Sequence, residues 1–177
     1  MLSVLFRIFC WAIPLTTAYL ILFDIQGMMN VGGWPAVLAN FDHPVLLEKV
    51  NLVNFSLAHR FILLAIEFLP ISLTVLIFYK LSGLFRLYAE ERYFEEKNVQ
   101  LIKGIGICIV SGQLIQIIYQ PIITLALTYT NPIGERYIAL GLGTTNAASF
   151  ITGFVIIVAS CIIKEANKLK SESQLTI

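Results

Sequence analysis

A single carboxyl group, Glu67, lies inside the apolar run of residues 64–70. Where such a run spans a membrane, a carboxyl is costly and indicates a functional or pairing role. Gln113, Gln116 and Gln120 recur at i, i+3 and i+7, which puts them on one face of a helix. Carboxyl and amide groups can hydrogen-bond to each other, or together bind a proton or a cation.

Glu67 and the glutamines lie at matching positions along their helices. Glu67 is 12 residues before Tyr79 and Gln113 is 12 residues after Leu101, or about 18 Å from each helix end at 1.5 Å per residue. If the two helices are neighbours, Glu67 meets Gln113 or Gln116.

Two interpretations of Glu67 follow. In the structural one, burial keeps the carboxyl protonated, and a hydrogen bond to a glutamine amide locks the helices together by about 0.6–2 kcal/mol. In the functional one, Glu67 is a proton or cation site in a polar cavity, reached from outside past Arg60 on the same face. Kinks at Pro70 and Pro121 favour the cavity. A transporter, however, normally needs more spans or a dimer.

Other side chains give no catalytic or metal-binding pattern. Cys10, Cys108 and Cys161 are single, and no CxxC pair for thiol exchange occurs. A bis-histidine haem needs one histidine on each of two facing helices. The sequence has two histidines, His43 and His59, both near the outer end, and His43 lies in a predicted loop. Nucleotide, serine-hydrolase and zinc-protease motifs are absent. We therefore expect no enzyme, no cofactor and no metal.

The composition identifies the setting of these groups. Of 177 residues, 58% are apolar and 13% are charged, with a net charge of +1. Soluble domains carry about 45–50% apolar and about 25% charged residues. This excludes intrinsic disorder, a basic nucleic-acid-binding domain that contacts nucleic acid directly, and a disulfide-rich secreted module. An integral membrane protein in a lipid bilayer remains.

The apolar segments predict an all-α, polytopic membrane protein: one transmembrane domain, residues 1–177, with a bundle of four transmembrane helices. A bilayer core about 30 Å thick needs roughly 20 apolar helical residues. Four segments fit, at about 4–23, 61–79, 101–127 and 147–163. An outer loop (24–60), a cytoplasmic loop (80–98) and a cytoplasmic tail (164–177) flank them.

Lysine and arginine are distributed unevenly between the two sides of the membrane. Three of the twelve lie on one side: Lys49, Arg60 and Arg136. The other nine are Arg7, Lys80, Arg86, Arg92, Lys97, Lys103, Lys164, Lys168 and Lys170. Because positive residues stay cytoplasmic, both termini and the loop 80–98 are predicted to face the cytoplasm.

Small residues on the last two spans predict close helix packing. Gly104, Cys108 and Gly112 recur every fourth residue, as do Ser149 and Gly153. Such motifs let helices pack closely either within one chain or between two copies of it, so they are compatible with a homo-oligomer.

The segments outside the spans each allow two roles. The outer loop 24–60 is a packing cap over the outer end of the bundle or a surface that binds a partner or a ligand outside the cytoplasm. The loop 80–98 is a salt-bridged connector, which begins as a continuation of the second helix, or a docking surface for a basic partner. The tail ends on the strand-like residues Leu175, Thr176 and Ile177, which can fray, add to a sheet edge or dock in a groove.

Two stretches resemble the bacterial four-span family called domain of unknown function 2975. Residues 93–106 are similar to its Phe-x-x-x-Asn-x-x-x-Leu start of the third span, with Phe94 and Asn98 at the matching positions. Here Arg92 and Tyr93 replace the family's usual glycine and proline. The closing stretch is similar to the family's Ala-x-x-Leu-x-x-Glu-x-x-Leu-Thr-Ile, through Ala166, Leu169, Glu172, Leu175, Thr176 and Ile177.

The resemblance implies a multi-pass protein of the bacterial cytoplasmic (inner) membrane with no assigned activity. Members look like frequent genetic neighbours of small helix-turn-helix regulators. The leading hypothesis is a non-enzymatic regulatory or sensory module that contacts such a regulator. Its expected contact residues are Phe94, Asn98, Leu169, Glu172, Leu175, Thr176 and Ile177. The alternative is a small transport or ligand-binding bundle that uses Glu67, Gln113, Gln116, Gln120 and Arg60.

Overall fold

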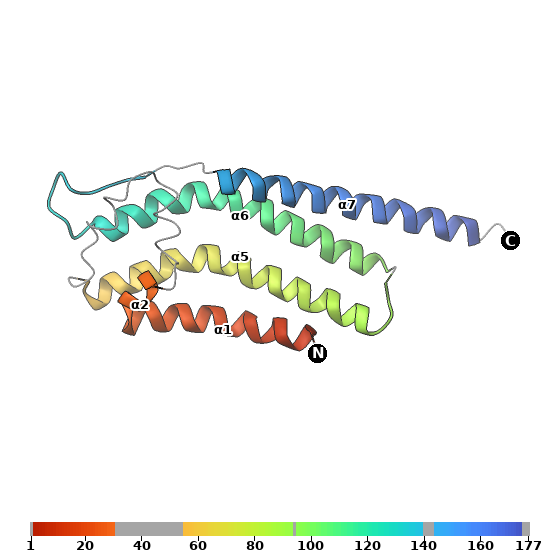
Figure 1. Ribbon diagram of the computed structural model, residues 1–177, viewed down its shortest axis with the longest axis horizontal. Helices are drawn as coiled ribbons and strands as arrows, with labels where there is room; N and C mark the ends of the chain where they lie inside the picture. Colours follow the sequence, from red (N-terminus) through yellow and green to blue (C-terminus); the bar gives the residue numbers. More distant parts are fainter. Residues whose placement is uncertain (1, 31–54, 94, 140–143, 175–177) are drawn as a thin grey trace. The chain divides into compact units, whose positions relative to one another are not determined.

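The computed structural model describes residues 2–30, 55–93, 95–139 and 144–174, and most of these residues are helical (Figure 1). The helices are α1 (Leu2–Phe23), α2 (Ile25–Asn30), α5 (Leu57–Ala89), α6 (Glu96–Thr128) and α7 (Thr144–Gln174). Four are long and apolar enough to cross a membrane: α1, α5, α6 and the part Ala147–Leu169 of α7. The predicted all-helical fold with four candidate spans is confirmed.

The helices are longer than the predicted spans, so parts of the predicted loops are helical. α5 extends from Leu57 in the predicted outer loop to Ala89 in the predicted cytoplasmic loop. The short helix α2 also lies in the predicted outer loop, where Asp24 caps it by accepting a 3.0 Å hydrogen bond from the backbone N–H of Gly27. Residues 31–54 of that loop lie outside the described residues.

Local signals fix both ends of α5. At its start, the Ser56 hydroxyl oxygen accepts a hydrogen bond from the His59 backbone N–H at 3.3 Å. At its end, Glu91 takes a positive φ of 57°, and the Arg92 N–H reaches back to the Leu87 carbonyl at 3.0 Å. With the Glu91 N–H on the Tyr88 carbonyl, this is a Schellman cap, which usually has glycine at the left-handed position.

The chain forms two compact units, which we describe separately. The first unit consists of the described parts of Met1–Trp11, Leu73–Gln113 and Thr145–Ile177. The second unit consists of the described parts of Ala12–Ser72 and Leu114–Thr144. The description as a single transmembrane domain stays a prediction.

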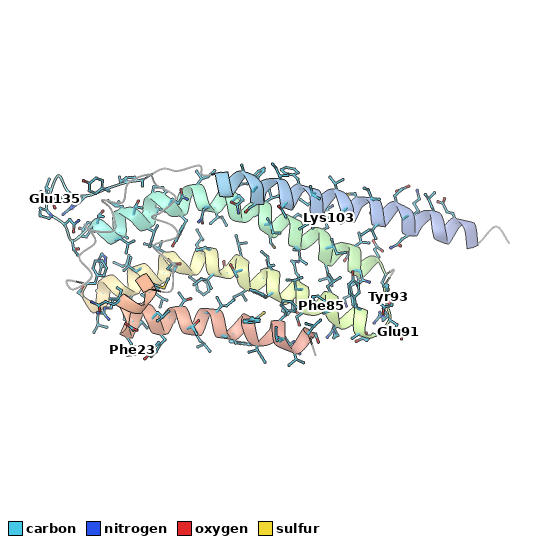
Figure 2. The ribbon with its side chains drawn as sticks, viewed as in Figure 1. Phe23, Phe85, Glu91, Tyr93, Lys103 and Glu135 are labelled. Atoms are coloured by element: carbon cyan, nitrogen blue, oxygen red, sulfur yellow. The ribbon has the colours of Figure 1, made fainter. Side chains whose placement is uncertain are left out.

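In the first unit, aromatic stacking joins α1 to α5. The rings of Phe6 and Phe85 stack with centroids 5.2 Å apart, and Figure 2 shows Phe85 on the side of α5 that faces α1. Phe78 packs against both Phe6 and Phe9. The Ser82 hydroxyl donates to the Ser3 carbonyl at 2.9 Å, so the start of α1 is held against α5.

The helices α6 and α7 approach each other at two glycines of the first unit. A Cβ atom at Gly106 would lie 2.9 Å from the Gly153 carbonyl oxygen, and one at Gly153 would lie 2.7 Å from a Val110 methyl. Both positions therefore exclude a larger side chain. Gly153 was predicted from its spacing, but its partner is Gly106, because Gly104 lies instead beneath the Lys80 side chain.

The second unit holds an apolar core contributed by α1, α2, α5 and α6. Its buried residues are Ile21, Ile25, Met28, Phe55, Leu63, Tyr119, Ile123 and Leu127. Tyr119 is the only phenol in this buried set, so its hydroxyl needs a polar partner inside an apolar environment.

The segment that follows α6 folds back along it in the second unit. The Thr128 hydroxyl oxygen accepts from the Tyr137 N–H at 3.0 Å, and that of Thr124 accepts from the Ala139 N–H at 3.1 Å. Gly134 makes the reversal with a φ of 100°, a conformation that suits glycine. Two threonine hydroxyls of α6 thus hold the backbone of the segment 137–139 by accepting its N–H groups.

Candidate functional site

Glu67 is paired with a tyrosine in the core of the second unit. The Tyr119 hydroxyl donates to the Glu67 carboxyl oxygen Oε1 at 2.5 Å, with Glu67 6% and Tyr119 2% exposed. The helix α5 supplies the carboxyl and α6 the phenol. The apolar side chains of Leu63 and Ile123, both fully buried, belong to the same core. This pair joins two helices where water has little access.

Tyr119 was not predicted as a site residue, although the sequence carries a signal for it. It follows Gln116 by three residues, so it lies on the same side of α6 as the glutamine stripe. A buried tyrosine needs a hydrogen-bond partner, and Glu67 is the carboxyl group inside the neighbouring predicted span, although Tyr119 lies 18 residues after Leu101 and Glu67 only 12 before Tyr79.

The three predicted glutamines do not belong to one unit. Gln116 and Gln120 lie in the second unit with Glu67, where Gln120 is fully buried and Gln116 is half-buried. Gln113 is the last α6 residue of the first unit. The predicted contact of Glu67 with a glutamine amide stays a prediction.

Arg60 has a defined structural partner. Its guanidinium atom Nη1 donates to the backbone carbonyl of Leu22 at 2.6 Å. Leu22 is in the last turn of α1, where carbonyls lack helical partners and a positive charge is favourable. Arg60 therefore caps α1. The interpretation of Arg60 as a route to Glu67 stays a prediction.

His59 lies in an aromatic stack at the start of α5. Its ring stacks on Phe55 at 4.5 Å and lies 6.4 Å from Tyr129, while Nε2 is 2.8 Å from the Ala126 carbonyl. The guanidinium of Arg136 lies 4.8 Å from the centre of the Tyr129 ring. His59 thus ties α5 to the end of α6. The second histidine, His43, lies outside the described residues.

An asparagine holds the turn between α5 and α6. The Asn98 side-chain amide donates to the Arg92 carbonyl, and Asn98 is 1% exposed. Arg92 in turn hydrogen-bonds to Glu95 and Glu90, and these bonds raise the pKa of Arg92 above its ordinary value. Asn98 therefore fixes the path of this turn, and its role in contacting a partner stays a prediction. Phe94 lies outside the described residues.

Metal-binding groupings are absent from the described part of the chain: no cluster of three or more His, Cys, Asp or Glu side chains occurs there. The cysteines Cys10, Cys108 and Cys161 are all free thiols, and the Cys10 sulfur lies 3.7 Å from the Val75 carbonyl.

A family model described as "Protein of unknown function (DUF2975)" matches residues 29–177. The chain belongs to this family. The resemblance in the α5–α6 turn and the tail is thereby confirmed. No curated protein and no solved structure matches the chain. The DUF2975 match contains the Glu67–Tyr119 pair, the turn held by Asn98 and all of α7, but its description assigns no activity.

The described part of the DUF2975 closing stretch, residues 166–174, lies on α7, which remains helical to Gln174. Leu169 is 59% exposed, and Glu172 is exposed in an ion pair with Lys168 at 4.0 Å. The expected contact residues Leu175, Thr176 and Ile177 lie outside the described residues.

Proposed function

We propose that this DUF2975 protein is a non-enzymatic regulatory or sensory module of the bacterial cytoplasmic membrane, which acts by binding another protein at the end of α7. The observation that carries the proposal is the helical segment 164–174, on which Lys164, Glu165, Lys168, Leu169 and Glu172 are exposed. It follows the predicted span end at Ile163, and its last turns extend past the α5–α6 turn of the same unit (Figure 1).

The surface of this segment suits a protein partner. Lys164, Glu165 and Lys168 present charges of both signs, and Leu169 adds an exposed apolar side chain. An apolar anchor with a polar rim is typical of protein interfaces. We propose that the partner is a cytoplasmic helix-turn-helix regulator, as the family resemblance implies.

A pull-down from membranes tests this function. The full chain and a chain lacking residues 165–177 are each used to capture partners, together with the point variant Leu169→Glu. We expect the full chain to capture the regulator, and the truncated chain and Leu169→Glu to lose it. As a matched control, Ile133→Glu changes an equally apolar, 94% exposed residue of the second unit and should leave capture intact. Equal capture by all variants, or capture of no regulator by the full chain, would overturn the proposal.

The proposed docking requires α7 to end in the cytoplasm. The excess of lysine and arginine around the α5–α6 turn and on the tail supports this orientation. In a background without the native cysteines, Glu135→Cys and Lys164→Cys, both at exposed positions, serve as single reporters. An impermeant maleimide should label Glu135→Cys in spheroplasts and Lys164→Cys only after permeabilisation. The reverse pattern would place the tail outside.

For Glu67 we infer a structural role in preference to transport. Its hydrogen bond with Tyr119 within an apolar core supports this, because a transport site needs access to water. Proton or cation flux into vesicles, measured as a function of pH for the wild type and Glu67→Gln, tests it. No flux, or flux with an unchanged pH profile, agrees with the structural role. Flux abolished by Glu67→Gln in a folded variant would restore the transport hypothesis.

A further inference from the structure

A cavity of about 260 Å³ opens in the first unit between the start of α1, the last turns of α5 and the start of α6. All its lining residues belong to this one unit: Ser3, Val4, Arg7, Tyr79, Ser82, Gly83, Arg86, Lys97 and Leu101. Gly83 leaves room at the wall, since its missing Cβ would be 3.4 Å from Leu101. The size is near the lower end of the roughly 300–1,000 Å³ of small-molecule sites, so it suits a compact group.

The charges around this cavity have one sign. Arg7, Arg86 and Lys97 line it from three different helices, and no acidic side chain is among the described lining residues. Within the described part of the chain, none of the three forms an ion pair. By contrast, Arg92 on the nearby turn binds two glutamates. Three converging cations without a counter-ion attract an anion.

The composition of the lining indicates which anion fits. Two guanidinium groups match the paired oxygens of a phosphate, and the hydroxyls of Tyr79 and Ser82 add polar groups. Val4 and Leu101 add an apolar part to the same wall. A ligand that is anionic at one end and apolar at the other matches both halves of the lining.

The position of the cavity points to the same kind of ligand. The predicted spans begin at Val4, end at Tyr79 and begin again at Leu101, and each of these residues lines the cavity. Three span ends therefore meet at the level where lipid headgroups lie. Next to the cavity on α1, Leu5 and Ile8 are exposed apolar residues that suit contact with acyl chains.

From these observations we propose that the Arg7–Arg86–Lys97 cavity binds the phosphodiester headgroup of an anionic phospholipid. The cations bind the phosphate oxygens, and the acyl chains lie along the apolar surface of α1. This site is independent of the docking surface on α7, since none of its lining residues belongs to α7.

Native mass spectrometry of the full chain in neutral detergent tests the site. Phosphatidylglycerol and phosphatidylcholine with the same acyl chains are titrated separately. We expect phosphatidylglycerol to bind about tenfold more tightly, and the triple variant Arg7→Gln/Arg86→Gln/Lys97→Gln to lose this preference. The control Lys103→Gln/Lys164→Gln/Lys168→Gln removes the same charge from the same unit outside the cavity, and it should keep the preference.

Single variants protect the test against misfolding of the triple variant. Arg86→Gln alone should weaken phosphatidylglycerol binding severalfold, whereas Lys103→Gln should not; both are checked for helicity by circular dichroism. Equal losses in the cavity and control variants, or no loss in either, would overturn the proposal. A further arm replaces lipid by inorganic phosphate: the same protection against heating by phosphate as by phosphatidylglycerol would overturn the assignment to a lipid.

Discussion

Two polar sites of this protein differ in how their charges are satisfied. In the second unit, Glu67 is buried and accepts a hydrogen bond from Tyr119. In the first unit, Arg7, Arg86 and Lys97 line an open cavity, and none of the three forms an ion pair with a described residue. A buried polar group that is hydrogen-bonded to a neighbouring helix stabilises the fold. Several positive charges that converge without a counter-ion can instead bind an anionic ligand.

The cations around the cavity are therefore a stronger functional candidate than the buried carboxyl of Glu67. An intramembrane carboxyl is by default the first candidate, and Glu67 is the most conspicuous one in the sequence. The structure gives Glu67 a partner from the neighbouring helix, while the arginines at the span ends, which serve in the sequence only to set orientation, converge on a cavity.

The largest effect is expected from removing the buried carboxyl. Glu67→Ala leaves the Tyr119 hydroxyl without its acceptor in an apolar core, which should cost roughly 1–3 kcal/mol of unfolding free energy. Unfolding in mixed micelles measures this loss. Glu67→Gln keeps an acceptor oxygen and should lose clearly less; equal losses would show that Glu67 acts through its charge.

A smaller effect is expected at Arg60, the arginine that has a backbone partner. Arg60→Gln removes the guanidinium that binds the Leu22 carbonyl, and it should lower stability by about 1 kcal/mol. The same unfolding assay applies, with Arg7→Gln as its control, because within the described residues Arg7 has no ion pair to lose. If the two substitutions lower the free energy of unfolding equally, the distinction between a charge paired in the fold and a charge available to a ligand is wrong.

The coupling between Glu67 and Tyr119 should be smaller still. A double-mutant cycle with Glu67→Gln and Tyr119→Phe isolates it, and we expect about 0.6 kcal/mol, with an upper bound of about 1.7 kcal/mol, as for other intramembrane hydrogen bonds. Purely additive losses would mean that the two side chains stabilise the core separately.

The smallest effect on stability is expected at the cavity. Arg86→Gln in lipid-free neutral detergent should change the unfolding free energy by less than about 0.5 kcal/mol, because the side chain is exposed and unpaired within the described residues. Thermal unfolding with added phosphatidylglycerol should then separate the variant from the wild type. A large loss without lipid would show that Arg86 supports the fold itself.

Much of the fold could be predicted because hydrophobic length alone determines it. The four spans follow from apolar runs of about 20 residues, and the helical spacing of Leu81, Leu84 and Phe85 already indicates that α5 continues past the span. The helix α2 was missed, although Asp24 and Gly27 carry a capping signal for it. Its six residues are too few to give a clear periodic pattern.

The candidate sites were predicted less well because pairing depends on which faces meet. The sequence places Glu67 at the depth of the glutamines, but it cannot tell which side chain of α6 points toward α5. Likewise Gly104, Gly106 and Gly112 are all small, yet only the packing decides that Gly106 meets Gly153. The spacing of residues in the sequence shows which side chains share one face of a helix. It does not show how the neighbouring helix is rotated about its axis, and so which of its side chains face that helix.

The sequence by itself determined that this is a helical, multi-pass membrane protein, and its closing residues already resembled the DUF2975 family. The tertiary structure decided that Tyr119 satisfies Glu67, that Arg60 caps α1, and that three cations from three helices share one cavity. The reason is physical. The free energy of transferring a helix into lipid is a sum over its side chains, so it can be read from the sequence. A hydrogen bond or a binding site depends instead on the positions of a few atoms from segments that are distant in the sequence.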